Sequence, residues 1–88
     1  MKIYKYLDSR CNASGNRIKF FRKEANLSQE QLAAKIQLLG LNLNQKAVSR
    51  IETGERVVLD YELIYFAKAL NVSIEQLLFD WPPEFNIN

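Results

Sequence analysis

Hydrophobic residues recur three and four positions apart along most of this chain, the spacing that places them on one face of a helix. In residues 16–24, Ile18 and Phe21 lie three apart among basic residues, so we expect one apolar stripe with a basic flank. Ser14 is a suitable N-cap because its hydroxyl can accept a hydrogen bond from a free backbone N–H. The pattern therefore predicts a first helix with a basic surface.

A second helix is expected to begin after Ser28. The Ser28 hydroxyl can accept the backbone N–H of Gln31 while the Gln31 side chain reaches back, which is the capping-box arrangement. Gly40 ends the helix because glycine readily adopts left-handed backbone angles. The residues expected on its buried face are Leu32, Ala33 and Ile36, with Leu39 a further candidate.

A third, shorter helix is expected over residues 45–52, between an Asn44 N-cap and a terminating Gly54. It turns only Val48 and Ile51 inward. A helix that buries so little has most of its surface left over, and in a small protein such a helix is usually presented to a partner.

Two more helices are expected near the C-terminus, capped by Asp60 and Ser73, before Pro82 and Pro83 prevent further helix. Their apolar positions are Leu63, Phe66, Ala67 and Leu70 in the fourth helix and Ile74, Leu77 and Leu78 in the fifth. The chain is thus expected to be all-α, with an N-terminal arm at 1–13, a helical domain at 14–79 and a C-terminal tail at 80–88.

Composition narrows the function classes. A chain of 88 residues allows one compact domain, and no apolar run reaches the ~18 residues of a membrane span. The single cysteine, Cys11, closes no internal disulfide, and the absence of histidine leaves neither a zinc cluster nor the usual base of a nucleophilic triad. We expect a cytoplasmic protein that is not an enzyme and needs no metal or cofactor.

The charge is uneven along the chain. Through Arg56 there are eleven Lys and Arg against five Asp and Glu, whereas from Val57 onward one lysine faces five acidic residues. A basic half indicates a polyanionic partner, although ordinary surface charge can also be uneven. The exposed candidates on the third helix are Gln45, Lys46, Ser49 and Arg50. These side chains suit the base edges of the major groove, although each taken alone could simply be a solvated polar residue.

Three blocks, at residues 27–33, 48–56 and 67–73, resemble the Cro/phage-repressor type of helix-turn-helix regulator, the XRE family. The resemblance extends from about Gly15 to Leu78. It implies a five-helix λ-repressor-like domain that binds double-stranded DNA sequence-specifically as a transcriptional regulator, with repression as the expected effect.

The resemblance also implies roles for individual residues. Base contacts fall on Gln45, Lys46 and Ser49, with Arg50 suited to base or phosphate. Backbone contacts fall on Gln29, Asn44 and Arg56, the last in the loop that starts at Gly54, with Arg17 and Lys19 as possible additions. Arg22 is expected to pair with Glu52 as a scaffold contact that orients the recognition helix.

One departure from the family pattern lies between Lys35 and Val48, where the chain has thirteen steps instead of about eight. We therefore expect a lengthened turn, in a register that buries Val48 and Ile51 and leaves Lys46 outside, because burying an unpaired lysine is costly. Four leucines are expected to pack this turn, with a partner surface as the alternative: Leu38, Leu39, Leu41 and Leu43.

A homodimer is expected because a domain this small gains specificity by pairing two recognition helices. The expected dimer surface consists of Leu78, Phe79, Trp81 and Phe85, unless Trp81 and Phe85 fold back on their own domain. The N-terminal arm could likewise contact a second copy or fold back on its own domain, through Tyr4, Tyr6 and Leu7. A third alternative is that the arm lies along DNA, through Lys2, Lys5 and Arg10.

Two alternatives to a simple regulator stay open. An antitoxin of the same fold would use its acidic half and its tail at 81–88 to occupy a toxin while the basic half binds the operator. A protein-interaction module would have kept the fold without DNA binding, and alanine at Gln45 and Lys46 would then leave partner binding intact.

Overall fold

The structure is a computed structural model that describes Tyr6 and residues 9–78. It contains five α-helices and no strand in these residues, which confirms the expected all-α class. The helices are α1 (Gly15–Glu24), α2 (Gln29–Leu38), α3 (Gln45–Thr53), α4 (Asp60–Leu70) and α5 (Ile74–Leu78). In the described part of the chain, none of them has the length and apolar character needed to cross a membrane.

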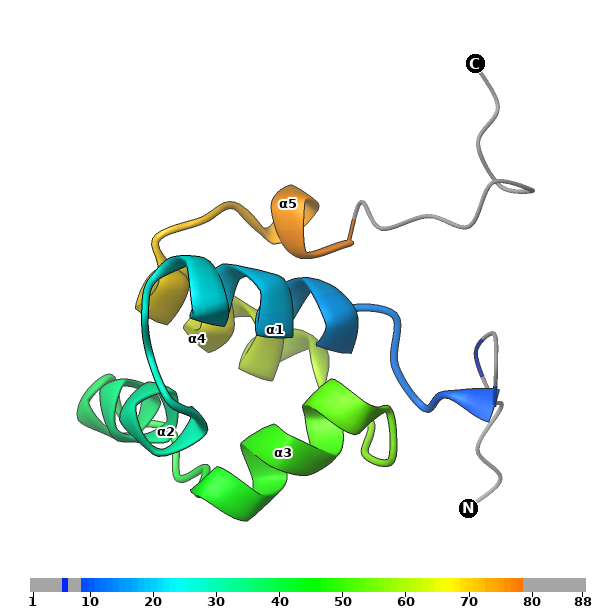
Figure 1. Cartoon of the computed structure of the whole chain (residues 1–88), viewed down its shortest axis with the longest axis horizontal. Helices are drawn as coiled ribbons and strands as arrows, with labels where there is room; N and C mark the ends of the chain where they lie inside the picture. Colours follow the sequence, from blue (N-terminus) through cyan, green and yellow to red (C-terminus); the bar gives the residue numbers. More distant parts are fainter. Residues whose placement is uncertain (1–5, 7–8, 79–88) are drawn as a thin grey trace.

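The helices pack in two groups around α1 (Figure 1). In this view α2 and α3 form the lower part of the molecule, with α3 along its lower edge, and both pack against each other. α4 lies behind α1 and α5 lies above it, and these three helices also contact one another. α2 also packs against α4, so α1 and the α2–α4 contact together join the α2–α3 pair to the C-terminal helices.

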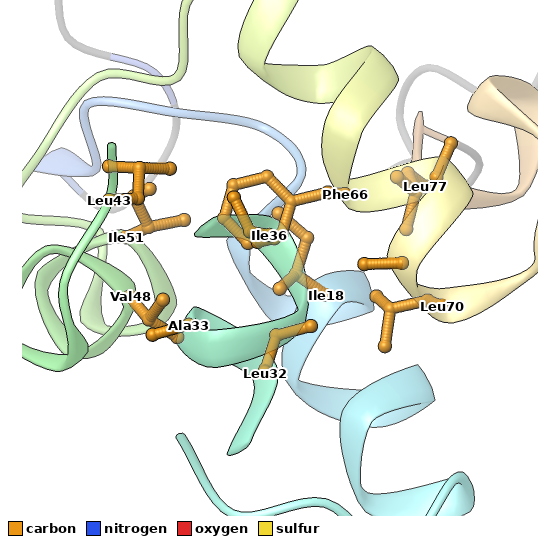
Figure 2. Close-up of a cluster of buried hydrophobic side chains, with 12 residues drawn as sticks. Ile18, Leu32, Ala33, Ile36, Leu43, Val48, Ile51, Phe66, Leu70 and Leu77 are labelled. Carbon is orange, nitrogen blue, oxygen red and sulfur yellow. The ribbon is translucent and has the colours of Figure 1, made fainter. Parts of the chain in front are cut away.

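The core forms where these helices meet (Figure 2). Phe66 from α4, Ile18 from α1 and Ile36 from α2 lie together and are fully buried. Val48 and Ile51 join the same cluster from α3. Burying side chains of this size contributes about 1.5–3 kcal/mol each. α3 is thus attached to the domain by the two apolar residues expected from its sequence.

The caps of α2 and α3 form as the sequence predicts. Ser28 Oγ accepts the Gln31 N–H at 3.0 Å, and Gln31 Oε1 accepts the Ser28 N–H at 2.8 Å. Asn44 Oδ1 accepts the Ala47 N–H at 2.9 Å. Gly54 ends α3 with a φ of +86°, in the left-handed region that favours glycine.

Two other expected caps are wrong. Ser14 precedes α1 but makes no side-chain cap because its backbone is already helical, and Asn12 Oδ1 accepts the Gly15 N–H instead, at 2.8 Å. Asp60 is the first residue of α4 rather than its cap. The free N–H of the preceding Leu59 is taken by a Glu62 carboxylate oxygen at 3.0 Å.

The lengthened turn between α2 and α3 is only partly packed. Leu43 is buried and Leu41 half-buried, and the Gln37 side chain holds the turn by donating to the Leu43 carbonyl at 2.7 Å. Leu38 and Leu39 are 89% and 44% exposed, so the expectation that they pack the turn is wrong. They precede the reversal at Gly40, whose φ is +108°, and only the leucines after it return to the core.

Candidate nucleic-acid interface

α3 presents a polar face away from the rest of the domain. Gln45, Lys46 and Arg50 are exposed and Ser49 is half-buried. In Figure 1 this helix borders the molecule, with no other described element below it. The four residues expected to contact bases therefore lie on one accessible side of one helix.

The C-terminal half of α3 carries a buried charge, at Glu52. Glu52 Oε2 accepts from Arg22 Nε of α1 at 2.6 Å, and its Oε1 accepts from Arg22 Nη2 at 3.0 Å. The two side chains are only 2% and 10% exposed. Arg22 Nη1 also donates to the Leu27 carbonyl at 2.8 Å. This two-bond ion pair, the one implied by the family resemblance, ties α3 to α1.

A chain of side-chain amides leads from this pair to the exposed face. Gln29 Nε2 donates to Glu52 Oε1 at 3.0 Å, and Gln29 Oε1 accepts from Gln45 Nε2 at 2.8 Å. The Glu52 carboxylate can only accept, so Gln29 must turn its NH₂ toward it and its oxygen toward Gln45. Gln45 must then donate to that oxygen. Its own Oε1 and its second N–H are left for a partner outside the domain.

The C-terminal end of α3 is fastened by residues that precede α1. Asn12 Nδ2 donates to the Ile51 carbonyl at 2.9 Å and to the Arg56 carbonyl at 2.8 Å. Arg10 Nη2 donates to the Glu52 carbonyl at 3.0 Å. The Ile51 and Glu52 carbonyls lie in the last turn of α3, where carbonyls have no i+4 partner within the helix, and the Arg56 carbonyl lies in the loop after it. The Arg10 cation suits the negative end of the helix dipole.

Residues 1–13 were expected to form an arm outside the helical domain, but residues 10–12 pack against the end of α3. Asn12 is 7% exposed and the Cys11 N–H donates to the Gly54 carbonyl at 2.7 Å, so residues 10–12 belong to the folded domain. Arg10, expected as a residue that could lie along DNA, is engaged by α3. Tyr6 is half-buried, whereas Lys2, Tyr4, Lys5 and Leu7 lie outside the described residues.

Two glycines allow this close approach. A Cβ at Gly15 would lie 2.2 Å from the Ile51 carbonyl oxygen, so α1 can begin against the end of α3 only without a side chain there. A Cβ at Gly54 would lie 2.8 Å from Cγ of Arg10. Gly54 could be predicted as a helix terminator from its position, but nothing in the local sequence pattern identified Gly15 as the point where α1 crosses the end of α3.

Arg56, expected at the DNA backbone, is bonded within the domain. Its Nη1 and Nη2 donate to the two carboxylate oxygens of Glu62 at 2.9 and 3.1 Å, and Nη1 also donates to the Val57 carbonyl. Burial by itself raises the pKa of Glu62, but the bonds from Arg56 and from the Leu59 N–H, with the Arg56 charge, lower it overall. The bonds with Glu62 raise the pKa of Arg56. The pair fixes the loop between α3 and α4, and phosphate contact by Arg56 stays a prediction.

The two basic residues of α1 that were expected to contact the DNA backbone differ in their surroundings. Arg17 lies toward α5, where its Nε donates to the Gln76 carbonyl at 3.2 Å and its guanidinium stacks over Phe20 and Phe21. Its described contacts therefore do not place it with the polar face of α3. Lys19 is exposed, and its contact with DNA stays a prediction.

The backbone-contact residues Gln29 and Asn44 lie beside that face, at the starts of α2 and α3. Gln29 is bonded to Gln45, and Asn44 uses its oxygen for capping, which leaves its NH₂. Of the expected dimer residues, Leu78 is 38% exposed. Phe79, Trp81 and Phe85 lie outside the described residues.

Comparison with known proteins supports the same interpretation. A helix-turn-helix family model matches residues 18–77. The structure is similar to that of the restriction-modification controller protein C.AhdI from Aeromonas hydrophila, with a TM-score of 0.65, 29% sequence identity, and coverage of 74% of this chain and 91% of the controller chain. A search of curated proteins gave no match. The chain belongs to the XRE-type helix-turn-helix family, and its fold supports a DNA-binding transcriptional regulator.

Proposed function

We propose that the protein is a sequence-specific transcriptional repressor that inserts α3 into the major groove of double-stranded DNA. The observation that carries this proposal is the accessible polar face of α3 beside the buried Arg22–Glu52 pair. A recognition helix has to keep its base-reading side chains in water while a rigid scaffold fixes its angle. Both conditions are met on this one helix, where Gln45 is exposed at the N-terminal end and Glu52 is buried about two turns further on.

Gln45 is the strongest candidate for reading a specific base. The bond to Gln29 fixes the direction of its amide, which leaves one acceptor and one N–H facing outward. Adenine presents the complementary pair in the major groove, a donor at N6 and an acceptor at N7. We therefore propose that Gln45 reads adenine, and that Gln29 holds the Gln45 amide while its remaining N–H contacts phosphate.

The other candidates divide by chemistry. Lys46 suits guanine O6 and N7, Ser49 suits several base edges, and Arg50 suits either guanine or phosphate. Asn44 and Lys19 would contact phosphates and set the register, as would Arg56 through its Nε–H and its second Nη2–H, which make none of the bonds described above. Phosphate contacts position a protein on DNA without reading its sequence. The phosphate-contacting residues should therefore affect affinity for any duplex, and the base-contacting residues should affect sequence preference.

The expected assembly is a homodimer on a two-fold symmetric operator. Two copies would place their α3 helices in successive major grooves about 34 Å apart. Repression would follow when the bound dimer covers promoter DNA. The antitoxin alternative needs the same DNA contacts together with a second protein, and co-purification of a toxin with the native chain would favour it.

Selection of bound duplexes from a randomised pool is the direct test. We expect a two-fold symmetric motif with an adenine in each half-site, and binding that weakens with a log–log salt slope of about 0.9 per phosphate contact. Replacing that adenine by 7-deazaadenine removes the N7 acceptor and should weaken binding. Recovery of no motif, or binding indifferent to salt, would contradict the proposal.

Substitutions on α3 test the assignment of residues. Lys46→Ala should weaken operator binding, whereas Lys35→Ala, which removes an exposed lysine from α2, should not. Gln45→Glu loses the N–H that both Gln29 and adenine N7 require, so it should lose the adenine preference. An unchanged motif with Gln45→Glu would show that Gln45 does not read the base.

A further inference from the structure

The outer face of α4 carries large apolar residues that no described part of the chain covers. Tyr61 is 51% exposed and Ile64 is 44% exposed. Asp60 at the start of the helix and Lys68 near its end are exposed as well. We refer to Asp60, Tyr61, Ile64 and Lys68 as the outer face of α4.

These four residues lie together because of their helical spacing. Positions 60, 64 and 68 are four apart and 61 and 64 are three apart, so all four fall on one side of the helix. The residues that α4 turns into the domain are Glu62, Phe66, Ala67, Ala69 and Leu70. The outer face is therefore a stripe with an apolar centre, an acidic residue at one end and a basic residue at the other.

We propose that this face binds a second copy of the chain, with the two α4 helices antiparallel about a two-fold axis at Ile64. Asp60 and Lys68 are each four residues from Ile64, about 6 Å along the helix. Antiparallel pairing then sets Asp60 of each copy opposite Lys68 of the other and brings the two Ile64 side chains together. The stripe is complementary to itself in this one arrangement.

Other arrangements lack this complementarity. A parallel pair would place Asp60 against Asp60 and Lys68 against Lys68, so like charges would meet at both ends. The antiparallel pair also sets the positive end of one helix dipole beside the negative end of the other. Charge therefore selects both the orientation and the register.

The proposal deepens the proposed function and rests on it for the symmetry of the operator. α4 packs against α1, α2 and α5, whereas α3 packs against α1 and α2 on the lower side of the molecule (Figure 1). Pairing through α4 would leave the polar face of α3 free in both copies. It assigns the dimer to residues of the folded domain, in place of the C-terminal set that begins with Leu78.

A charge swap tests the register without DNA. Asp60→Lys chains carry two lysines on the stripe and Lys68→Asp chains carry two aspartates, so each variant alone should dimerise at least tenfold more weakly than the native chain in sedimentation velocity. An equimolar mixture restores both opposite-charge contacts, and we expect it to form heterodimers about as tightly as the native homodimer. The double variant, Asp60→Lys with Lys68→Asp, should also recover dimerisation.

Glu30→Lys is the matched control. It places a lysine in the first turn of α2, as Asp60→Lys does in α4, and should leave the dimer unchanged. Circular dichroism of each variant separates loss of folding from loss of pairing. Variants that dimerise like the native chain, a mixture without heterodimer preference, or a native chain that stays monomeric would each overturn the proposal.

The two proposals fail in different ways. A monomer that still selects an operator would overturn the α4 interface and leave the DNA-binding proposal intact. A charge-dependent dimer that selects no duplex would do the reverse.

Discussion

The two ends of α3 are held in opposite ways. At its C-terminal end, Glu52 is 4% exposed and bonded to Arg22, while Asn12 and Arg10 cover the last carbonyls. At its N-terminal end, Lys46 is exposed with no bond within the described domain, and Gln45 is exposed with one bond to Gln29. One short helix therefore has a fixed end and an available end.

This difference separates stability from recognition. Removing a buried, bonded group costs folding free energy because the polar groups left behind are cut off from water. Removing an exposed group costs little unless a ligand contacts it. Substitutions at the fixed end should thus change unfolding, and substitutions at the available end should change DNA binding.

Glu52→Ala should have the largest effect. It leaves the Arg22 guanidinium buried without its counter-charge, and breaking a buried ion pair from one side costs about 3–5 kcal/mol of unfolding free energy. Urea denaturation would measure this loss. Replacing both partners by apolar residues, as in Arg22→Met with Glu52→Leu, should recover much of it, and a double variant no better than Glu52→Ala would contradict the buried-charge explanation.

Asn12→Ala should come next. Its side chain accepts from the Gly15 N–H and donates to the Ile51 and Arg56 carbonyls, and leaving such groups unsatisfied costs about 1–3 kcal/mol. Asn12→Asp is the sharper variant, because its carboxylate keeps the acceptor for Gly15 but faces two carbonyls without a donor. We expect Asn12→Asp to be at least as destabilising as Asn12→Ala; a smaller loss would show that the donor bonds contribute little.

The Glu62–Arg56 pair should make stability depend on pH. The pKa of Glu62 lies below its ordinary value of 4.5 in the folded chain, so the unfolded chain binds a proton first as the pH falls. The stabilisation is present above the ordinary value and disappears as the pH falls through the lowered pKa. The Arg56 side chain is 29% exposed, so we expect a smaller effect than at Glu52.

Glu62→Gln should flatten this pH dependence, measured by urea denaturation between about pH 6 and pH 3. Arg56→Met removes the same ion pair from the other side. Because burial by itself raises the pKa of Glu62, this variant should no longer lose stability when Glu62 takes up its proton in acid. A native-like slope in both variants would show that another carboxylate causes the acid sensitivity.

Gln45→Ala should change stability least, by less than about 0.5 kcal/mol, because the side chain is exposed and its one bond joins two partly solvated amides. Operator affinity measured by fluorescence anisotropy should nevertheless fall, by about 1–3 kcal/mol if Gln45 reads a base. A loss of stability comparable with that of Asn12→Ala would erase the contrast between the two ends.

Much of the fold could be predicted from the sequence. The caps at Ser28 and Asn44, the stop at Gly54 and the inward residues Val48 and Ile51 are all found in the structure. Each depends on residues within one helical turn of one another, so the local pattern contains the necessary information. The Arg22–Glu52 pair, thirty residues apart in the chain, was available only through the family resemblance.

The fixed end of α3 could not be predicted in this way. Asn12 is 39 residues from Ile51 and 44 from Arg56. A local signal did exist, since an asparagine three residues before a helix start is a capping candidate, but Ser14 competes for the same role. Only the crossing of α1 over the end of α3, at Gly15, decides between them.

The sequence by itself determined the number and order of the helices, the caps of α2 and α3 and which helix sides are apolar, because hydrogen bonds and side-chain spacing within a turn act over a few residues. The tertiary structure alone decided which polar groups are enclosed and which stay in water. Whether a polar group is enclosed depends on which distant segments of the chain meet. Asn12 is enclosed at the end of α3 and makes three hydrogen bonds, whereas Lys46 stays exposed.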